Sequence, residues 1–321
     1  MHRRMLFILL AGATVALAAQ PAASQGWPDK PVKVIVPYAA GGATDGIARP
    51  WAEQLSKAFG QQFVIENRGG ASGMIGMEAL AKSAPDGYTL IMSPNAVLSV
   101  LPSLRKTPYD PLKDIVPIGH TGEVLCGHVI SPKLGIKTMQ ELIAYAKKNP
   151  GKVSYGSSGN GTANHLRLEA LKLKAGIDIL HVPYRGGADA LNDLLAGNVD
   201  IQNEPVNLPH AKAGKLTLLA VNGSRRNPDF PDVPTLTEVG IQGADVPIFF
   251  GFYGPKGIPD AIVQKINTKM LELEKNPEFL KTLWNVNAIP APLSPAQMRT
   301  LLENDIKANL EIIKAANIKL E

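Results

Sequence analysis

Short runs of consecutive apolar residues alternate along this chain with longer segments in which apolar residues recur every three or four positions. The short runs are typical of strands that are buried on both faces of a parallel sheet. The longer periodic segments are typical of amphipathic helices. The pattern predicts strands over the following ranges: Val32–Val36, Phe63–Ile65, Thr89–Met92, Val124–Ile130, Val153–Tyr155, Ile179–Val182, Val199–Ile201, Leu216–Val221 and Ile248–Tyr253.

Several helix starts carry recognisable capping signals. Thr138 and Glu141 have the spacing of a capping box. Ser294 and Gln297 repeat this spacing, with Pro295 at the first helical position. Further helices are predicted over 163–174 and 188–196 and from Pro259 and Pro277 onwards.

The alternation of strands and helices predicts an α/β fold with doubly wound sheets. The spacing of the elements changes near Thr121–Ser131 and again near Leu216–Tyr253, where loops rich in Pro, Gly and Asn separate the strands. We interpret these two regions as crossings between two lobes. The first lobe is predicted to contain residues 26–123 and 247–321, and the second residues 124–246.

The first 25 residues have the pattern of a secretion signal. Arg3 and Arg4 form a basic start, and an apolar run from Met5 to about Ala19 is too short for a comfortable membrane span, which needs about 20 residues. Small residues follow, as at a cleavage site. We therefore expect an exported protein that acts in the periplasm.

Charge and cysteine content exclude several classes of protein. Removing Arg3 and Arg4 lowers the formal charge from +5 to +3, and the lysines are spread along the chain, which argues against nucleic acid as a partner. Cys126 is the only cysteine, so no intramolecular disulfide can form. The histidines lack metal-binding spacing, and we expect no metal and no cofactor.

Three loops follow predicted strands at the end where open α/β sheets bind their ligands. Each offers backbone N–H groups, and two of them precede a helix, whose N-terminus favours an anion. No P-loop or GxGxxG pattern is present. The candidate ligand-binding residues are Tyr38, Ala39, Ala40, Gly41, Gly42, Ala43, Thr44 and Asp45 in the first loop, Ser93 and Asn95 in the second, and Ser157, Ser158, Asn160, Gly161 and Thr162 in the third.

Three polar residues near these loops have open roles. Asp45 is either an N-cap or first-turn acid, which the helix dipole favours, or a contact for a ligand amine or hydroxyl. Asn203 and Glu204 end the predicted strand at 199–202 and are candidates for lining the same cleft. Glu204 could equally be a solvated acid at the rim.

A catalytic alternative uses the same third loop. Ser157 or Ser158 with His165 or His181 could form a nucleophile and a base, which would make the protein a serine-dependent periplasmic hydrolase. However, the chain lacks the Gly-x-Ser-x-Gly elbow of many such enzymes. A binding loop is the interpretation that we favour, and we expect no enzymatic activity.

A series of motifs through the mature chain resembles the Bug family of periplasmic solute receptors, the binding components of tripartite tricarboxylate transporters. The motifs are Trp27–Pro31, Pro37–Asp45, Glu66–Arg68, Ala84–Leu90, Tyr109–Asp114, His181–Gly186, Ala213–Leu216 and Pro231–Thr235. The resemblance implies a two-lobed, type II periplasmic-binding-protein fold with a small organic carboxylate held between the lobes. It also implies that the membrane subunits of such a transporter are the partner, and we expect a monomer.

The same resemblance implies how the ligand is held. One carboxylate would meet main-chain amides of Tyr38–Asp45 and Ser157–Thr162, and the far end of the ligand would meet Ser93–Asn95 and Asn203–Glu204. Family members commonly carry an Asp-Ser-like pair in place of Asn203-Glu204. An ionised Glu204 would repel a second carboxylate, so this departure predicts a neutral or cationic distal group. A ligand sensor for a membrane kinase is an alternative to a transport receptor, and the sequence does not distinguish between them.

Overall fold

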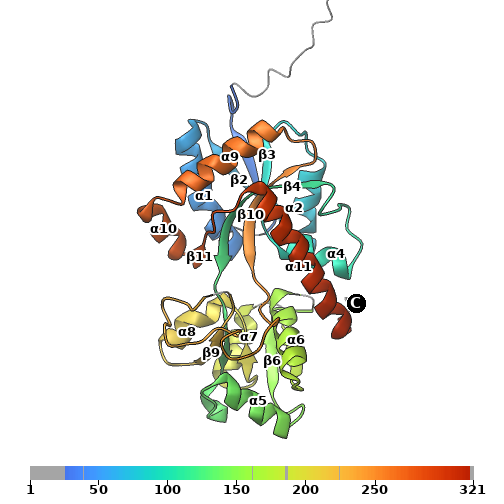
Figure 1. The fold of residues 1–321 in the computed structure, drawn as a ribbon, viewed down its shortest axis with the longest axis vertical. Helices are drawn as coiled ribbons and strands as arrows, with labels where there is room; N and C mark the ends of the chain where they lie inside the picture. The colour runs from blue at the N-terminus through green and yellow to red at the C-terminus, as the bar shows by residue number, and fades with distance from the viewer. Residues whose placement is uncertain (1–25, 39, 161, 185–186, 224, 319–321) are drawn as a thin grey trace, which may run out of the picture.

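The computed structural model describes residues 26–38, 40–160, 162–184, 187–223 and 225–318. The predicted secretion signal lies outside these ranges. Two lobes stand one above the other, each with its own sheet and its own layer of helices (Figure 1). The predicted two-lobed α/β fold is therefore confirmed.

The sheet of the first lobe has the strand order β11-β4-β10-β3-β1-β2 in the described part of the chain. β1 pairs in parallel with β2 and β3, whereas β10 runs antiparallel to β3 and β4. The sheet is therefore mixed rather than purely parallel. Its strands are β1 (Val32–Val36), β2 (Phe63–Asn67), β3 (Thr89–Pro94), β4 (Ile115–Val124), β10 (Phe249–Pro255) and β11 (Ala288–Ile289).

The sheet of the second lobe has the strand order β7-β6-β8-β5-β9. One side of this sheet is parallel, because β6 pairs in parallel with β7 and β8, whereas on the other side β5 runs antiparallel to β8 and β9. Its strands are β5 (Gly127–Ile130), β6 (Ser154–Ser157), β7 (Leu180–Pro183), β8 (Ile201–Gln202) and β9 (Thr217–Val221).

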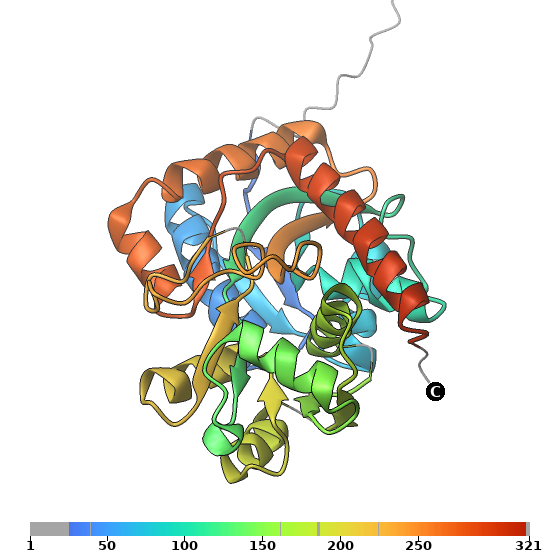
Figure 2. The same ribbon diagram turned by 60° about the horizontal axis from the view of Figure 1, so that its bottom comes forward.

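Helices cover both sheets, as the turned view also shows (Figure 2). The first lobe carries α1 (Ala43–Phe59), α2 (Met74–Ala81), α3 (Ala96–Ser99), α4 (Leu101–Leu104), α9 (Asp260–Leu273), α10 (Pro277–Trp284) and α11 (Pro295–Ala315), with the 3₁₀ turn Ala71–Gly73. The second lobe carries α5 (Met139–Lys148), α6 (Ala163–Ala175), α7 (Gly187–Ala196) and α8 (Leu208–Lys212), with the 3₁₀ turns Pro132–Leu134 and Pro205–Asn207.

The predicted helix starts are confirmed where the structure describes their caps. Thr138 accepts a hydrogen bond from the backbone N–H of Glu141, and Ser294 forms a complete capping box with Gln297. Pro277 occupies the first position of α10. These boundaries could be predicted because a cap satisfies its own helix terminus and needs no distant partner.

One predicted strand was wrong in a way that matters for the hinge. The apolar run Val124–Ile130 is not a single strand: Val124 ends β4 in one sheet, and Gly127 begins β5 in the other. Leu125 and Cys126 between them carry the chain from lobe to lobe. Both sheets bury their strands, so the run stays apolar across the crossing and its pattern cannot mark the break.

The chain returns to the first lobe beside the segment by which it left. The backbone N–H of Val124 donates to the carbonyl of Ile248, and that of Asn222 donates to the carbonyl of Cys126, at 2.9 and 2.8 Å. Figure 1 shows the outgoing and returning segments side by side between the lobes. Two adjacent connections of this kind form a natural hinge.

Helix α11 extends beyond the first lobe and packs against α6 of the second (Figure 1). Ile312 and Ile313 belong to the same buried cluster as Leu166 and Leu171 of α6. The assignment of all of 247–321 to the first lobe therefore stays a prediction. In the described ranges, no helix has both the length and the apolar character needed to cross a bilayer.

Candidate functional site

A cavity of about 370 Å³ lies between the lobes. This volume falls in the range of about 300–1,000 Å³ that small-molecule sites occupy. Its lining comes from Tyr38, Ser72, Pro94, Ala96, Val100, Leu101 and Arg105 of the first lobe, from Ser158, Asn160, Thr162, Ala163 and Asn164 of the second, and from Ile248 of the returning segment. The first and third predicted loops therefore contribute to one cavity.

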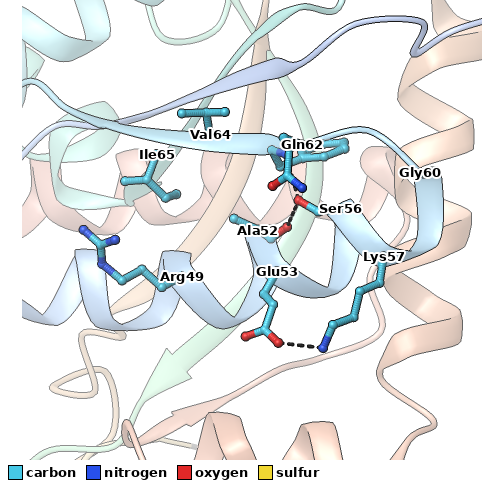
Figure 3. A pocket seen from close by; sticks show the side chains of 10 residues that line it. Arg49, Ala52, Glu53, Ser56, Lys57, Gly60, Gln62, Val64 and Ile65 are labelled. Atoms are coloured by element: carbon cyan, nitrogen blue, oxygen red, sulfur yellow. Dashed lines mark hydrogen bonds and ion pairs between the residues drawn. The ribbon is translucent and has the colours of Figure 1, made fainter.

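Two of the larger hollows in the described structure have a different character. One, of about 690 Å³, lies along α1 and β2 and is shown in Figure 3. Its rim carries the exposed ion pair of Glu53 and Lys57 at 2.6 Å. The other, of about 750 Å³, lies beside Trp27 and α9. None of the predicted ligand-binding residues lines either hollow, so the inter-lobe cavity is the better candidate.

The first loop is held in shape by Asp45. Its buried carboxylate accepts hydrogen bonds from the backbone N–H of Gly41 at 2.9 Å, from Asn67 Nδ2 at 2.9 Å and from Arg49 at 2.8 and 3.0 Å. Burial acts to raise the pKa of Asp45, but these hydrogen bonds together lower it below its ordinary value. The carboxylate therefore stays ionised and organises the start of α1, as a first-turn acid does.

Tyr38 forms the part of this loop that reaches the cavity. Its hydroxyl donates to the carbonyl of Ser72 at 3.3 Å, and the backbone carbonyl of Tyr38 accepts from Asn67 Nδ2 at 3.1 Å. Burial raises the pKa of Tyr38 to about 12, so its hydroxyl keeps the proton. The ring is thus fixed between β1 and the 3₁₀ turn, and it presents a rigid surface to a ligand.

The third loop places a helix N-terminus at the cavity. Thr162 caps α6: its hydroxyl accepts from the backbone N–H of His165 at 3.4 Å and donates to the carbonyl of Gly159 at 2.8 Å. The N–H groups of Ala163 and Asn164 have no partner within the helix, and both residues line the cavity. This end of a 13-residue helix carries a partial positive charge and favours an anion.

Ser157 and His181 lie beneath that loop at the distance of a catalytic pair. Ser157 Oγ is 2.7 Å from His181 Nε2, and it also accepts from the N–H of Gly159 at 3.1 Å. The His181 ring stacks on His165, with centroids 4.0 Å apart, and burial lowers the pKa of His181 to about 4. However, Ser157 is fully buried and does not line the cavity.

The second loop is turned toward α11. Asn95 donates to Asp305 Oδ2 at 2.7 Å and to the carbonyl of Pro247 at 3.2 Å, and its own oxygen accepts from Phe249 N at 3.3 Å. Ser93 is buried and donates to the carbonyl of Pro94 at 3.1 Å. In this loop it is Pro94, with the following Ala96, that lines the cavity.

Asn203 belongs to a buried network around Arg167 of α6. Arg167 Nη1 donates to Asn203 Oδ1 at 3.1 Å, and Arg167 Nε donates to the carbonyl of Val246 at 2.7 Å. Asn203 in turn donates to Asn222 Oδ1 at 2.6 Å. The network joins α6 to the returning segment of the hinge, which the sequence pattern did not indicate.

Glu204 is partly buried and is linked to the cavity through Ser158. Ser158 lies beside the Glu204 carboxyl, and its hydroxyl accepts from Asn164 Nδ2 at 2.8 Å, whereas Glu204 Oε1 has no hydrogen-bond partner among the described residues. Burial raises the pKa of Glu204 to about 7, although Ser158 and the charge of Arg167 oppose this. Close to neutral pH the group can thus carry a proton, which weakens the repulsion that the sequence analysis assigned to it.

The structure therefore divides the predicted site residues. Tyr38, Ser158, Asn160 and Thr162 line the cavity. Ala40, Gly41, Gly42 and Ala43 are exposed, and Thr44, Asp45, Ser93, Asn95, Ser157, Asn203 and Glu204 are buried or partly buried without lining it. Ala39 and Gly161 lie outside the described residues. Sequence reasoning gave no ligand role to Ser72, Asn164 and Arg105, which approach the predicted loops only in the folded chain.

Two sheets joined by two adjacent crossings, with a cavity between them that both lobes line, define a two-lobed solute-binding protein. Residues 47–318 match the family model described as the tripartite tricarboxylate transporter family receptor, and the chain belongs to this family. BugT of Bordetella pertussis is 36% identical over 328 residues, covering 100% of this chain and 99% of BugT. The chain is accordingly an extracytoplasmic solute receptor of the Bug type.

Solved structures agree with this assignment. The R. palustris protein Rpa4515, solved with adipate, is 34% identical, with a TM-score of 0.79 over 91% of this chain and 99% of that chain. MatC from Rhodopseudomonas palustris, solved with bound malate, is 28% identical, with a TM-score of 0.74 over 89% of this chain and 100% of that chain.

Proposed function

We propose that this receptor acts in the periplasm after loss of a signal within residues 1–25, and binds a small organic carboxylate in the inter-lobe cavity. One carboxylate of the ligand accepts hydrogen bonds from the free N–H groups at the start of α6, beside Ser158 and Thr162. Tyr38 packs against the ligand from the other lobe. The observation that carries the proposal is the N-terminus of α6 opening into a cavity that both lobes line.

Related receptors support a carboxylate as the ligand. Rpa4515 was solved with adipate and MatC with malate, and both share the fold of this chain over most of its length. Each charge-assisted hydrogen bond to a carboxylate contributes roughly 1.5–3 kcal/mol. Two backbone donors at α6 would therefore hold a carboxylate without any cationic side chain at that end.

Ligand binding would close the lobes about the paired crossings at Val124–Gly127 and Val246–Phe249. The closed form would then present a new surface to the membrane subunits of a tripartite tricarboxylate-type transporter. A membrane sensor kinase could recognise the same closed form. Membership in a transporter receptor family favours transport.

The hydrolase alternative has one observation in its favour, the 2.7 Å contact between Ser157 and His181. Three others oppose it. Ser157 is buried, its oxygen already accepts from Gly159, and a histidine with a pKa of about 4 is a weak base. We therefore propose that this pair shapes the third loop and that the protein has no catalytic activity.

Replacing Ala163 by Pro tests the carboxylate site directly. Proline removes one backbone N–H, yet it is tolerated at the first position of a helix, and Thr162 already has the extended backbone that a following proline requires. Isothermal titration with succinate, malate and adipate should show binding to wild type and about tenfold or greater weakening in A163P.

The control variant Ala163→Ser keeps the N–H group and should bind within about threefold of wild type. Circular dichroism would verify that both variants are folded. If A163P bound the preferred acid as tightly as A163S does, the backbone amides of α6 would not hold the ligand, and the proposed site would be wrong.

A further inference from the structure

The lining of the inter-lobe cavity is uncharged except at one position. Among the described lining residues, Arg105 alone has a charged side chain; the others are apolar or neutral polar residues. Arg105 follows α4 directly and caps it through its backbone. The cavity therefore combines one cation of the first lobe with the N-terminus of α6 from the second lobe, and its described lining holds no acid.

The guanidinium of Arg105 is also free of protein partners. Within the described part of the chain it forms no hydrogen bond and no ion pair. Arg105 is exposed, whereas Arg49 is paired with Asp45 and Arg299 donates to the carbonyl of Ile115 at 2.7 Å. A guanidinium at this mostly apolar cavity, with all its donors available, matches the planar, two-oxygen geometry of a carboxylate.

We propose that Arg105 is the specificity-determining residue of this receptor and that it binds a second carboxylate of the ligand. The inference rests on the proposed function, because the first carboxylate is the one held by the N-terminus of α6. The ligand class is then a dicarboxylate whose two ends contact different lobes. Such a ligand bridges the cleft, so the same contact that selects a diacid also favours the closed form.

Glu204 does not oppose a second carboxylate. It is absent from the described lining of the cavity, and its carboxyl is partly buried behind Ser158. The sequence argument for a neutral or cationic distal group required an ionised Glu204 facing that group. In the fold, the charged side chain at the cavity is Arg105, so the distal group that fits is an anion.

The test compares diacids with their own monoamides, which keep the length but lose one charge. Isothermal titration would measure succinate against succinamate and adipate against adipamate, using protein from which co-purified ligand has been removed by unfolding and refolding. Wild type should prefer the better diacid over its monoamide by about 10- to 100-fold. In Arg105→Gln this preference should fall below about threefold, and Arg105→Lys should retain part of it.

Lys106→Gln provides the matched control, because Lys106 is the neighbouring exposed cation and does not line the cavity. It should keep the full preference for the diacid. An unchanged preference in Arg105→Gln, or equal binding of diacid and monoamide by wild type, would overturn the role of Arg105 while leaving a carboxylate receptor in place. Failure of wild type to bind any of the four compounds would overturn the proposed function and this inference with it.

Discussion

Each lobe contributes one wall to the inter-lobe cavity: the first wall is the loop before α1, and the second wall is the loop before α6. In both walls a strand ends, a loop follows and a helix begins. However, an anionic side chain anchors the first wall and a cationic side chain anchors the second. In the first lobe, the Asp45 carboxylate accepts from Gly41, Arg49 and Asn67, all within the same lobe. In the second lobe, the Arg167 guanidinium of α6 donates to Val246, which lies 79 residues away on the returning segment. One anchor is local and the other spans the hinge.

This difference indicates how a ligand could move the lobes. The proposed carboxylate site lies at the N-terminus of α6. Arg167 joins this helix to the hinge, and the helix belongs to the same buried cluster as Ile312 of α11. A group at Arg105 or Tyr38 contacts the first lobe, whose loop is fixed internally. We therefore expect the second wall to transmit ligand binding to the hinge and the first wall to act as a rigid counterpart.

The largest expected effect on stability comes from breaking the anchor of the second wall. Arg167→Met would leave the buried acceptors Val246 O and Asn203 Oδ1 without their donor. We expect the free energy of unfolding to fall by about 3 kcal/mol, measured by urea denaturation. Asp45→Asn is the counterpart in the first wall and should cost about 1–2 kcal/mol, because Asn keeps some of the hydrogen bonds. An equal or larger loss in Asp45→Asn would contradict the comparison.

A smaller effect is expected in the pH dependence of the free energy of unfolding, through Glu204 beside the second wall. The pKa of Glu204 is raised from 4.5 to about 7, mainly by burial, so the folded protein holds this proton more tightly than the unfolded chain does. The stability that this group contributes is therefore greatest below pH 4.5 and falls as the pH rises toward 7. Glu204→Gln should match wild type near pH 5 and be more stable by about 1–2 kcal/mol near pH 8.

Urea denaturation at four pH values between these limits would measure this difference. Glu311→Gln, which removes an exposed carboxylate of α11, is the control and should show no such trend. If the difference in stability between Glu204→Gln and wild type stayed constant with pH, the pKa of Glu204 would not be raised. Glu204 would then be ionised at neutral pH, as the sequence argument for repulsion of a second carboxylate assumed.

The smallest effect on stability is expected from a change at Ser157, which with His181 forms the pair that the hydrolase alternative requires. Ser157→Ala removes a buried hydroxyl that contacts His181 and Gly159, and should cost about 1 kcal/mol of stability. Affinity for the preferred carboxylate should stay within about threefold of wild type. Hydrolysis of p-nitrophenyl acetate should be equally slow in both proteins, whereas serine-dependent turnover that Ser157→Ala abolishes would favour the hydrolase alternative.

The local features of this fold were predictable from the sequence. The capping box at Ser294, the cap at Thr138 and the strand Val32–Val36 all appear where the pattern placed them. Such features depend on neighbours within a few residues, so local sequence is sufficient to specify them. The motifs also identified the receptor family, since the motifs typical of that family occur in order along this chain.

Long-range features were decided only by the tertiary structure. The apolar run Val124–Ile130 conceals a crossing between two sheets, because strands buried in either sheet look alike. Asn95 belongs to a predicted loop, but its amide is used by Asp305 of α11, 210 residues away. Arg105 stands in no motif, and only the approach of the two lobes places it at the cavity beside the N-terminus of α6.

The sequence by itself therefore determined the class of this protein and one half of its chemistry, the strand–loop–helix units whose backbone amides favour an anion. The tertiary structure decided which side chains face the ligand. The physical reason is that a backbone donor is created by local conformation, whereas the charge at a cavity depends on which distant side chains are left without partners when the lobes meet.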